Sequence, residues 1–164
     1  MPRGPERYRA RLATLRELPT FAGLSDDAIE RIAEHVAEIT IQPGEHLCRQ
    51  GSPALEAFII VEGIAQLIAD GTIVRDIERG ELIGEIAVLS GKPRTASVRA
   101  LTRLEAFVLN VGDVKWLMNE PSASPVVRTA MSRHLESDKE RHPEPDLLGM
   151  VRGLVGRALK GLRG

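Results

Sequence analysis

The sequence is poor in the residues that define several common protein classes. Its 164 residues include one cysteine, Cys48, so a secreted fold held by internal disulfides is excluded. Aromatic residues make up 3%, too few for a surface on which nucleic-acid bases stack, and the net charge of -1 argues against a strongly basic nucleic-acid binder. No apolar run approaches the roughly 18 residues of a membrane-spanning helix, and residues 1–17 lack the apolar core of a secretory signal. We therefore expect a cytoplasmic protein.

What the sequence does contain is typical of one globular domain with extensions. Hydrophobic residues make up 43% and charged residues 27%, enough for a core without metals or disulfides. Residues 1–20 carry five arginines against two glutamates (+3), and residues 143–164 carry four basic against two acidic side chains (+2), so the part between them is acidic (-6). We expect a basic N-terminal helix at 1–18, a domain at 19–141 and an amphipathic basic tail at 142–164.

Two helices are expected in the first quarter of the chain. Apolar residues three or four positions apart between Tyr8 and Leu18 predict the first helix. Pro19 ends it, because proline has no amide hydrogen with which to continue the helix. Ser25 is suited to cap the second helix, since two aspartates follow it in the first turn, where the helix dipole favours negative charge.

From residue 38 onward the pattern changes to short β-rich runs separated by glycines. Turn signals every 4–12 residues between short strands indicate a small antiparallel barrel or roll. A parallel α/β sheet is not expected, because no long helix follows each strand. The expected strands are 38–41, 46–49, 57–61, 64–68, 72–77, 95–100 and 104–109.

Helices are expected again after the β-rich part. Asn110 is suited to cap a helix at 111–119, and a further helix is expected at 124–141. Prolines at 121, 125, 143 and 145 interrupt this region and provide hinge points. In the tail, apolar residues recur at alternating spacings of three and four, which suits a helix that packs along one seam.

The segment 83–98 carries the clearest chemical signal. Gly84 follows an apolar run and allows a close approach of the backbone to a ligand or a positive φ. A helical turn at 86–89 would point free amide groups at the same place, an arrangement that binds phosphate. Arg94 comes after a Gly-Lys-Pro turn and can add a bidentate contact to an anion, whereas Glu85 is suited to accept a hydrogen bond from a hydroxyl. Together these groups indicate a nucleotide or a sugar phosphate.

This segment resembles the phosphate-binding cassette of the cyclic nucleotide-binding domain family. Supporting similarities lie upstream at 43–45, 50–51 and 58–63, and the resemblance spans about residues 18–140. Ile83 is a departure, because the family commonly has an aromatic residue there. The matching residues are Gly84, Glu85, Ala87, Leu89, Pro93, Arg94, Ala96 and Val98.

The resemblance implies a fold and a ligand. The fold is α+β and mainly β, an antiparallel eight-stranded β-roll of the double-stranded jelly-roll type with N-terminal helices and C-terminal lid or hinge helices. The ligand that it implies is a cyclic nucleotide, cAMP or cGMP, and no metal or other cofactor is implied. We expect cAMP as the main ligand because arginine supplies 18 of the 22 basic residues, which indicates a bacterial source.

The resemblance also implies roles for individual residues. Glu85 would take the ribose 2′-hydroxyl and Arg94 the cyclic phosphate, while the Thr95 hydroxyl would reach the phosphate and, in a syn purine, the guanine 2-amino group. Backbone amides of Ile86, Ala87 and either Thr95 or Ala96 would complete the phosphate cradle. The base would rest among apolar residues of the roll and the C-terminal lid, for which the candidates are Ile64, Val74, Ile83, Val98, Val127 and Met131.

Structural interpretations of the same residues stay open at this point. Glu85 and Arg94 by themselves would make a surface ion pair, Thr95 an ordinary strand residue, and Val127 and Met131 parts of a helix core. A metal enzyme of the cupin type needs clustered histidine and glutamate ligands, which the four separated histidines do not supply. No nucleophile pair or nucleotide-hydrolysis motif is present, so we do not expect an enzyme.

The output of such a module must be argued from the rest of the chain. Only 22 residues follow His142, too few for a winged helix-turn-helix, so we expect no DNA binding. We expect a sensor that signals through its C-terminal helices to a second copy or an effector protein, either as a stand-alone module or as part of a longer one. Contact of the tail with a membrane surface is the less favoured option. The alternative is a non-sensing interaction module whose tail recruits a partner or a membrane.

Overall fold

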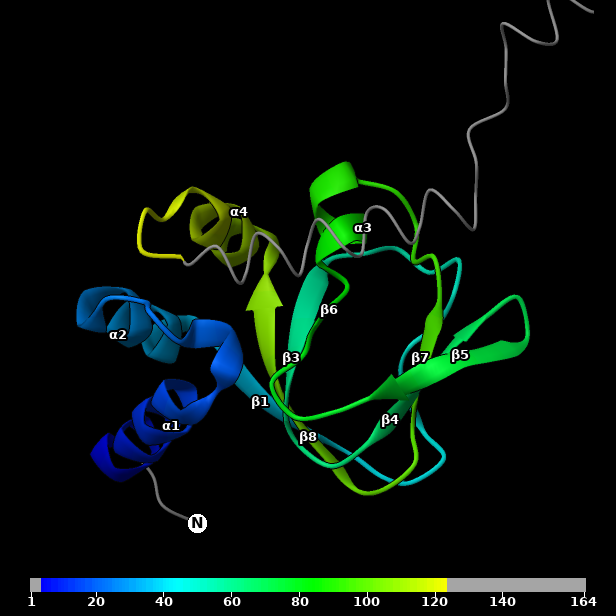
Figure 1. Cartoon of the computed structure of the whole chain (residues 1–164), viewed down its shortest axis with the longest axis horizontal. Coiled ribbons are helices and arrows are strands. Elements are labelled where there is room, and N and C mark those ends of the chain that lie inside the picture. The colour runs from blue at the N-terminus through cyan, green and yellow to red at the C-terminus, as the bar shows by residue number, and fades with distance from the viewer. Residues whose placement is uncertain (1–3, 124–164) are drawn as a thin grey trace, which may run out of the picture. The chain divides into compact units, whose positions relative to one another are not determined.

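The computed structural model describes residues 4–123, drawn in colour in Figure 1. The expected helix at 124–141, the tail at 142–164 and the two lid candidates Val127 and Met131 lie outside the described residues. Within residues 4–123, no helix combines the length and the apolar character needed to cross a bilayer.

Helices precede and follow the strands, and their expected caps are present. α1 (Pro5–Glu17), the short 3-10 helix η1 (Pro19–Phe21) and α2 (Asp26–His35) come before the strands, and α4 (Val111–Asn119) comes after them. The Ser25 hydroxyl accepts a hydrogen bond from the amide of Ala28 at 3.2 Å, and the Asn110 side chain accepts one from the amide of Asp113 at 2.9 Å. Each cap of this kind contributes about 1 kcal/mol to helix stability.

Arginines fix the basic helix α1 to the domain. Arg7 and Arg11 both bond the carboxylate of Glu38, at 3.1 and 2.9 Å, and Arg11 also donates to the carbonyl oxygen of Ala33 at 2.6 Å. Pro19 ends α1 as expected, but it also begins η1, because its fixed φ suits the first position of a helical turn. The helix predicted from its apolar spacing is therefore confirmed, and two of its arginines attach it to the rest of the domain.

Eight strands within residues 4–123 form two antiparallel sheets. The strand orders are β1-β8-β3-β6 and β2-β7-β4-β5. Figure 1 shows the two sheets facing each other as a roll. The expected fold class, α+β and mainly β with an eight-stranded antiparallel roll, is therefore confirmed. The strands are β1 (Ala37–Ile41), β2 (His46–Cys48), β3 (Glu56–Glu62), β4 (Ala65–Ala69), β5 (Thr72–Ile77), β6 (Leu82–Ile83), β7 (Ser97–Ala100) and β8 (Leu104–Asn110).

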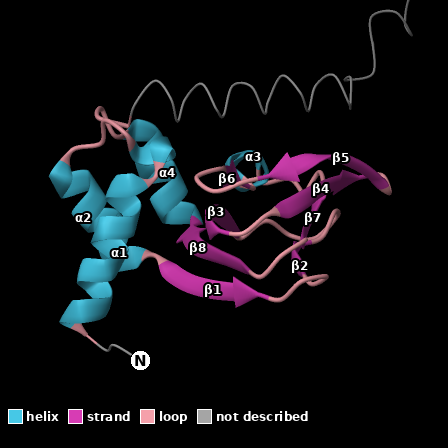
Figure 2. Ribbon diagram, turned by 60° about the horizontal axis from the view of Figure 1, so that its bottom comes forward, coloured by secondary structure: helices cyan, strands magenta, loops and turns pink. Residues whose placement is uncertain are grey.

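The two central strands of the first sheet, β3 and β8, are covered on both faces. Ala57 and Ile59 of β3 belong to the core beneath the helices, whereas Ile60 belongs to the core inside the roll. Figure 2 shows α1, α2 and α4 gathered beside this sheet. Burial on both faces explains why β3 is an uninterrupted apolar run, since a strand with one wet face would alternate apolar and polar residues.

Two details differ from the expected strands. β6 has no counterpart among them, because a strand of two residues is too short to show any periodicity; it pairs Ile83 with Phe58 and Leu82 with Ile59. The strand expected at 95–100 begins later, at Ser97, because Thr95 and Ala96 form a bend before it.

β4 and β5 form a hairpin at the edge of the second sheet. Its turn residues Asp70 and Gly71 have φ angles of 51° and 76°, as a two-residue hairpin turn of the primed type requires. The Gln50 side chain donates to the Asp70 carboxylate at 2.7 Å and accepts from the Asp70 amide at 2.9 Å. Between Arg75 and Ile73 the pairing register shifts, which leaves Val74 as the extra residue of a bulge.

Candidate functional site

The segment singled out in the sequence folds as strand, helix, loop and strand. β6 ends at Ile83, α3 (Glu85–Ser90) follows, and β7 begins at Ser97. The expected helical turn is confirmed and is one residue longer at each end. Gly84 and Gly91 flank α3, both in the left-handed conformation with φ of 85° and 68°. No side chain caps the first turn of α3.

Gly84 lies against the guanidinium group of Arg94. A Cβ atom on Gly84 would overlap Nη1 of Arg94 and approach the carbonyl oxygen of Glu56 to 3.5 Å. The carbonyl oxygen of Gly84 accepts from the amide of Val88 at 3.2 Å and from Arg94 Nη1 at 3.4 Å. Glycine is therefore needed at this position for two reasons: its backbone conformation and the space that Arg94 occupies.

The Arg94 side chain is buried, with 3% of its surface exposed. Its Nη2 donates to the backbone carbonyl oxygen of Glu56 at 2.6 Å, and its guanidinium carbon lies 5.3 Å from the centre of the Phe58 ring. Two carbonyl oxygens and an aromatic face thus hold one side of the charged group. Favourable contact with an aromatic face contributes about 0.5–2 kcal/mol, depending on how far the cation is desolvated.

The backbone of Arg94 is fixed as firmly as its side chain. Its amide donates to the carbonyl oxygen of Ser52 at 2.9 Å, and its carbonyl oxygen accepts from the amide of Gly51 at 2.8 Å. Both partners belong to the loop between β2 and β3. The adjacent residue Gln50 donates its amide to the hydroxyl of Ser97 at 2.8 Å, so the same loop also holds the start of β7.

Acidic groups near Arg94 differ in their exposure. Glu85 is 1% exposed at the start of α3, whereas the Glu56 side chain is 41% exposed, with its Oε1 4.0 Å from Arg94 Nη2. Because Glu85 and Arg94 are both buried, the interpretation of this pair as a surface ion pair is wrong.

Burial raises the pKa of the Cys48 thiol, and the nearby positive charge of Arg94 partly offsets that effect.

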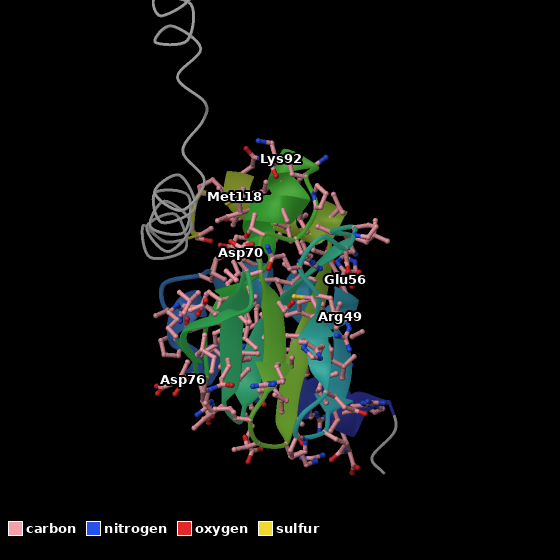
Figure 3. All side chains as sticks on the ribbon, turned by 90° about the vertical axis from the view of Figure 1, so that its right-hand side faces the viewer. Arg49, Glu56, Asp70, Asp76, Lys92 and Met118 are labelled. Atoms are coloured by element: carbon pink, nitrogen blue, oxygen red, sulfur yellow. The ribbon has the colours of Figure 1, made fainter. Side chains whose placement is uncertain are left out.

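The structure brings some of the predicted cradle residues to one place. Gly84, Glu85, Ile86 and Ala87 form the connection into α3, with Ala87 buried and Ile86 half-buried. Thr95 and Ala96 follow Arg94 directly and are half-buried. Lys92 is exposed, and Figure 3 shows it at the outer end of the domain.

The predicted base-pocket residues separate into two groups. Ile83 and Val98 lie in the same apolar core inside the roll, at 8% and 1% exposure. Val74 is 42% exposed in the β5 bulge. Ile64 follows the end of β3 that lies opposite Glu56, about 20 Å along a strand of seven residues, so the structure does not bring it to Arg94. We therefore leave Ile64 out of the site.

Glu56, Phe58 and Ser52 hold Arg94 and were not among the predicted site residues. Two of these contacts use backbone carbonyl oxygens, which every residue type possesses, so no side-chain pattern could have indicated them. Phe58 lies in the apolar run of β3, and an aromatic residue there is equally typical of a core. Within residues 4–123, no three histidine, cysteine or acidic side chains are grouped closely enough to hold a metal ion.

Comparison with known protein families identifies this arrangement. The model of the cyclic nucleotide-binding domain matches residues 38–120, from β1 to the end of α4. The chain belongs to the cyclic nucleotide-binding domain family. The resemblance seen in the sequence is therefore confirmed, and the chain carries a regulatory domain of this family.

Relatives of the domain occur in larger proteins with different activities. The chain is 43% identical over 99 residues to the acetyltransferase Pat of Mycolicibacterium smegmatis, covering 58% of this chain and 30% of that protein. It is 31% identical over 115 residues to a cAMP-dependent protein kinase regulatory subunit of Emericella nidulans, covering 69% of this chain and 28% of that protein. The solved structure of a cAMP-binding acyltransferase from Mycobacterium smegmatis matches with a TM-score of 0.67 and 32% identity, over 80% of this chain and 43% of that one. The chain thus spans less than a third of each of the two full-length relatives.

The contact between Gly84 and Arg94 predicts unequal effects of alanine at the two glycines that flank α3. Both residues have positive φ, so Gly84→Ala and Gly91→Ala each introduce backbone strain of about 1–2 kcal/mol. A Cβ at Gly91 meets nothing within 4 Å, whereas one at Gly84 displaces the buried guanidinium. We expect Gly84→Ala to lower the free energy of unfolding in urea by at least 1 kcal/mol more than Gly91→Ala. Equal losses would show that Arg94 moves aside without cost.

Proposed function

We propose that this domain binds a 3′,5′-cyclic purine nucleotide, with Arg94 as the phosphate ligand. The supporting observation is the buried guanidinium group, which is held from one side by two carbonyl oxygens and the Phe58 ring. Burial of an ionised side chain costs several kcal/mol unless an opposite charge compensates. A cyclic phosphate carries one negative charge and two free oxygens, and a guanidinium group binds such an anion through two parallel hydrogen bonds.

The remaining cradle residues fit the sugar and the phosphate. The missing side chain of Gly84 lets the Arg94 guanidinium group lie beside the start of α3, and the amides of Ile86, Ala87 and either Thr95 or Ala96 add donors for the phosphate. Glu85 accepts the hydrogen bond of the ribose 2′-hydroxyl. Ile83 and Val98 supply the apolar surface for the base, with Val74, Val127 and Met131 as further candidates.

Among cyclic nucleotides, we propose cAMP as the main ligand and cGMP as a weaker one. The acyltransferase that shares 32% identity with this chain is described as cAMP-binding, which favours cAMP. The Thr95 hydroxyl, next to Arg94, supports the acceptance of cGMP, because it can also accept from the guanine 2-amino group.

The role that we propose is regulatory rather than catalytic. The matched part makes up less than a third of two longer relatives, one named as an acetyltransferase and the other as a kinase regulatory subunit. We propose that binding of the nucleotide is passed to an effector protein or a second copy of the chain through the helices that follow the roll. The alternative is a non-sensing interaction module, and a titration with cyclic nucleotides distinguishes the two.

Removal of the Arg94 charge should nearly abolish nucleotide binding. Loss of one partner from a buried, hydrogen-bonded charge pair costs about 2–5 kcal/mol, which is roughly a 30- to 5,000-fold loss of affinity. Calorimetric titration with cAMP and cGMP measures this for wild type and Arg94→Ala, with circular dichroism to show that the variant is folded. Lys92→Ala is the matched control, because its exposed side chain lies outside the cradle and should cost less than about 1 kcal/mol. Wild-type affinity in folded Arg94→Ala, or no binding by wild type at millimolar nucleotide, contradicts the proposal.

Removal of the Thr95 hydroxyl should separate the two nucleotides. In Thr95→Ala, cGMP loses a contact to its base as well as one to its phosphate, whereas cAMP loses the phosphate contact alone. A lost neutral hydrogen bond costs about 0.5–1.5 kcal/mol, so the affinity for cGMP should fall roughly 2- to 12-fold further than that for cAMP. Equal losses for both nucleotides would show that Thr95 does not contact the base.

Helix α4 is the first element through which binding would be passed on. Val88 of α3 lies in the same apolar core as Val114 and Leu117 of α4, so a shift of α3 changes the packing of α4. A ligand moves these helices only if it binds one arrangement better than the other. Hydrogen exchange with saturating cAMP should show increased protection at 84–98 and altered protection at 111–119 and beyond, whereas β1 should stay unchanged. A response confined to 84–98 would mean that the signal does not travel through α4.

A further inference from the structure

Glu56 lies close to Arg94 with both its backbone and its side chain, and the two groups act differently on the guanidinium group. Its backbone carbonyl oxygen accepts from Arg94 Nη2 at 2.6 Å, which helps to position the guanidinium group. Its side-chain Oε1 lies 4.0 Å from the same nitrogen, too far for a hydrogen bond but at the limit of an ion pair. The carboxylate is 41% exposed while the guanidinium is 3% exposed, so the acidic group stands at the solvent side of a buried cation.

The carboxylate contributes little to the position of Arg94. That position is set by the carbonyl oxygens of Glu56 and Gly84, by the Phe58 ring, and by the loop that holds the Arg94 backbone. None of these contacts requires an acidic side chain at residue 56. What the carboxylate does supply is a negative charge about 4 Å from the nitrogen that a phosphate would approach.

We propose that Glu56 is an affinity-determining residue, an internal anion whose carboxylate competes with phosphate for Arg94. The inference rests on the proposed function, because it concerns the same arginine and the same ligand phosphate. A bound cyclic phosphate has to share the cation with Glu56 and is repelled by it, so the carboxylate weakens binding. An uncharged nucleoside is not repelled, and Glu56 therefore reduces the preference of the site for nucleotides over nucleosides.

The size of this effect follows from the exposure of the carboxylate. Interactions between charges that are partly open to water are worth about 0.2–1 kcal/mol, which corresponds to a change in affinity of up to about fivefold. Mobile ions screen such charges, with a Debye length of roughly 10 Å at 0.1 M salt and 30 Å at 0.01 M. The effect of Glu56 should therefore be largest in dilute buffer.

The variant Glu56→Gln tests the proposal, because it removes the charge and keeps the backbone carbonyl oxygen that holds Arg94. Glu62→Gln is the matched control, since it removes the same charge from the other end of the same strand, about 20 Å away, where the side chain is exposed. Calorimetric titrations with cAMP, cGMP and adenosine at 0.02 M and 0.2 M salt compare both variants with wild type. We expect Glu56→Gln to bind the cyclic nucleotides about two- to fivefold more tightly in low salt, with a smaller gain in high salt and no gain for adenosine.

The possible outcomes separate this inference from the proposed function. If wild type and Glu62→Gln bind cAMP, and Glu56→Gln binds it equally or more weakly, the role of Glu56 is refuted while the proposed function stands. An equal gain for adenosine refutes it too, because the gain would then not involve the phosphate. If Glu56→Gln binds cAMP and wild type does not, the competing role is supported and the proposed function of the natural chain fails. Absence of binding by all three proteins overturns both proposals.

Discussion

The positive charge of Arg94 is buried, and much of the surrounding structure follows from keeping it there. Residue 84 has no side chain because the guanidinium group occupies that space. The loop between β2 and β3 bonds the Arg94 backbone on both sides, and β3 contributes a carbonyl oxygen and the Phe58 ring. Burial of a cation is costly, and the Glu56 carboxylate lies only at the limit of an ion pair with it, so the proposed ligand anion would complete this interaction.

This arrangement joins the proposed ligand site to both apolar cores. β3 begins at Glu56, whose carbonyl oxygen holds Arg94, and it contributes Ala57 and Ile59 to the core under the helices and Ile60 to the core inside the roll. α3 begins at the same place and contributes Val88 to the core that contains α4. The arginine therefore stands where the roll, the short helix and the flanking helices meet.

The features that could be predicted from sequence are those that depend on neighbouring residues. Ser25 and Asn110 indicate helix starts because a cap bonds an amide three residues away, and glycine-bounded apolar runs indicate most strands. β6 cannot be predicted because two residues show no period, and Ile64, a predicted base-pocket residue, follows the end of β3 that lies opposite Glu56. Arg94 was found from its motif, but the contacts that hold it were not, because two of them come from backbone oxygens 38 and 10 residues away.

The hairpin of β4 and β5 has a consequence for contacts between copies of the chain. β5 is the outer strand of its sheet, and its Ile73 and Val74 are 53% and 42% exposed. An exposed apolar edge strand can pair with a strand of another copy of the chain. The bulge at Val74 interrupts the regular spacing of donors and acceptors that an incoming strand would need, and the charged residues Arg75 and Asp76 follow immediately. The irregularity thus protects the sheet against growth by edge-to-edge pairing, so an apolar strand is tolerated at the surface of this domain.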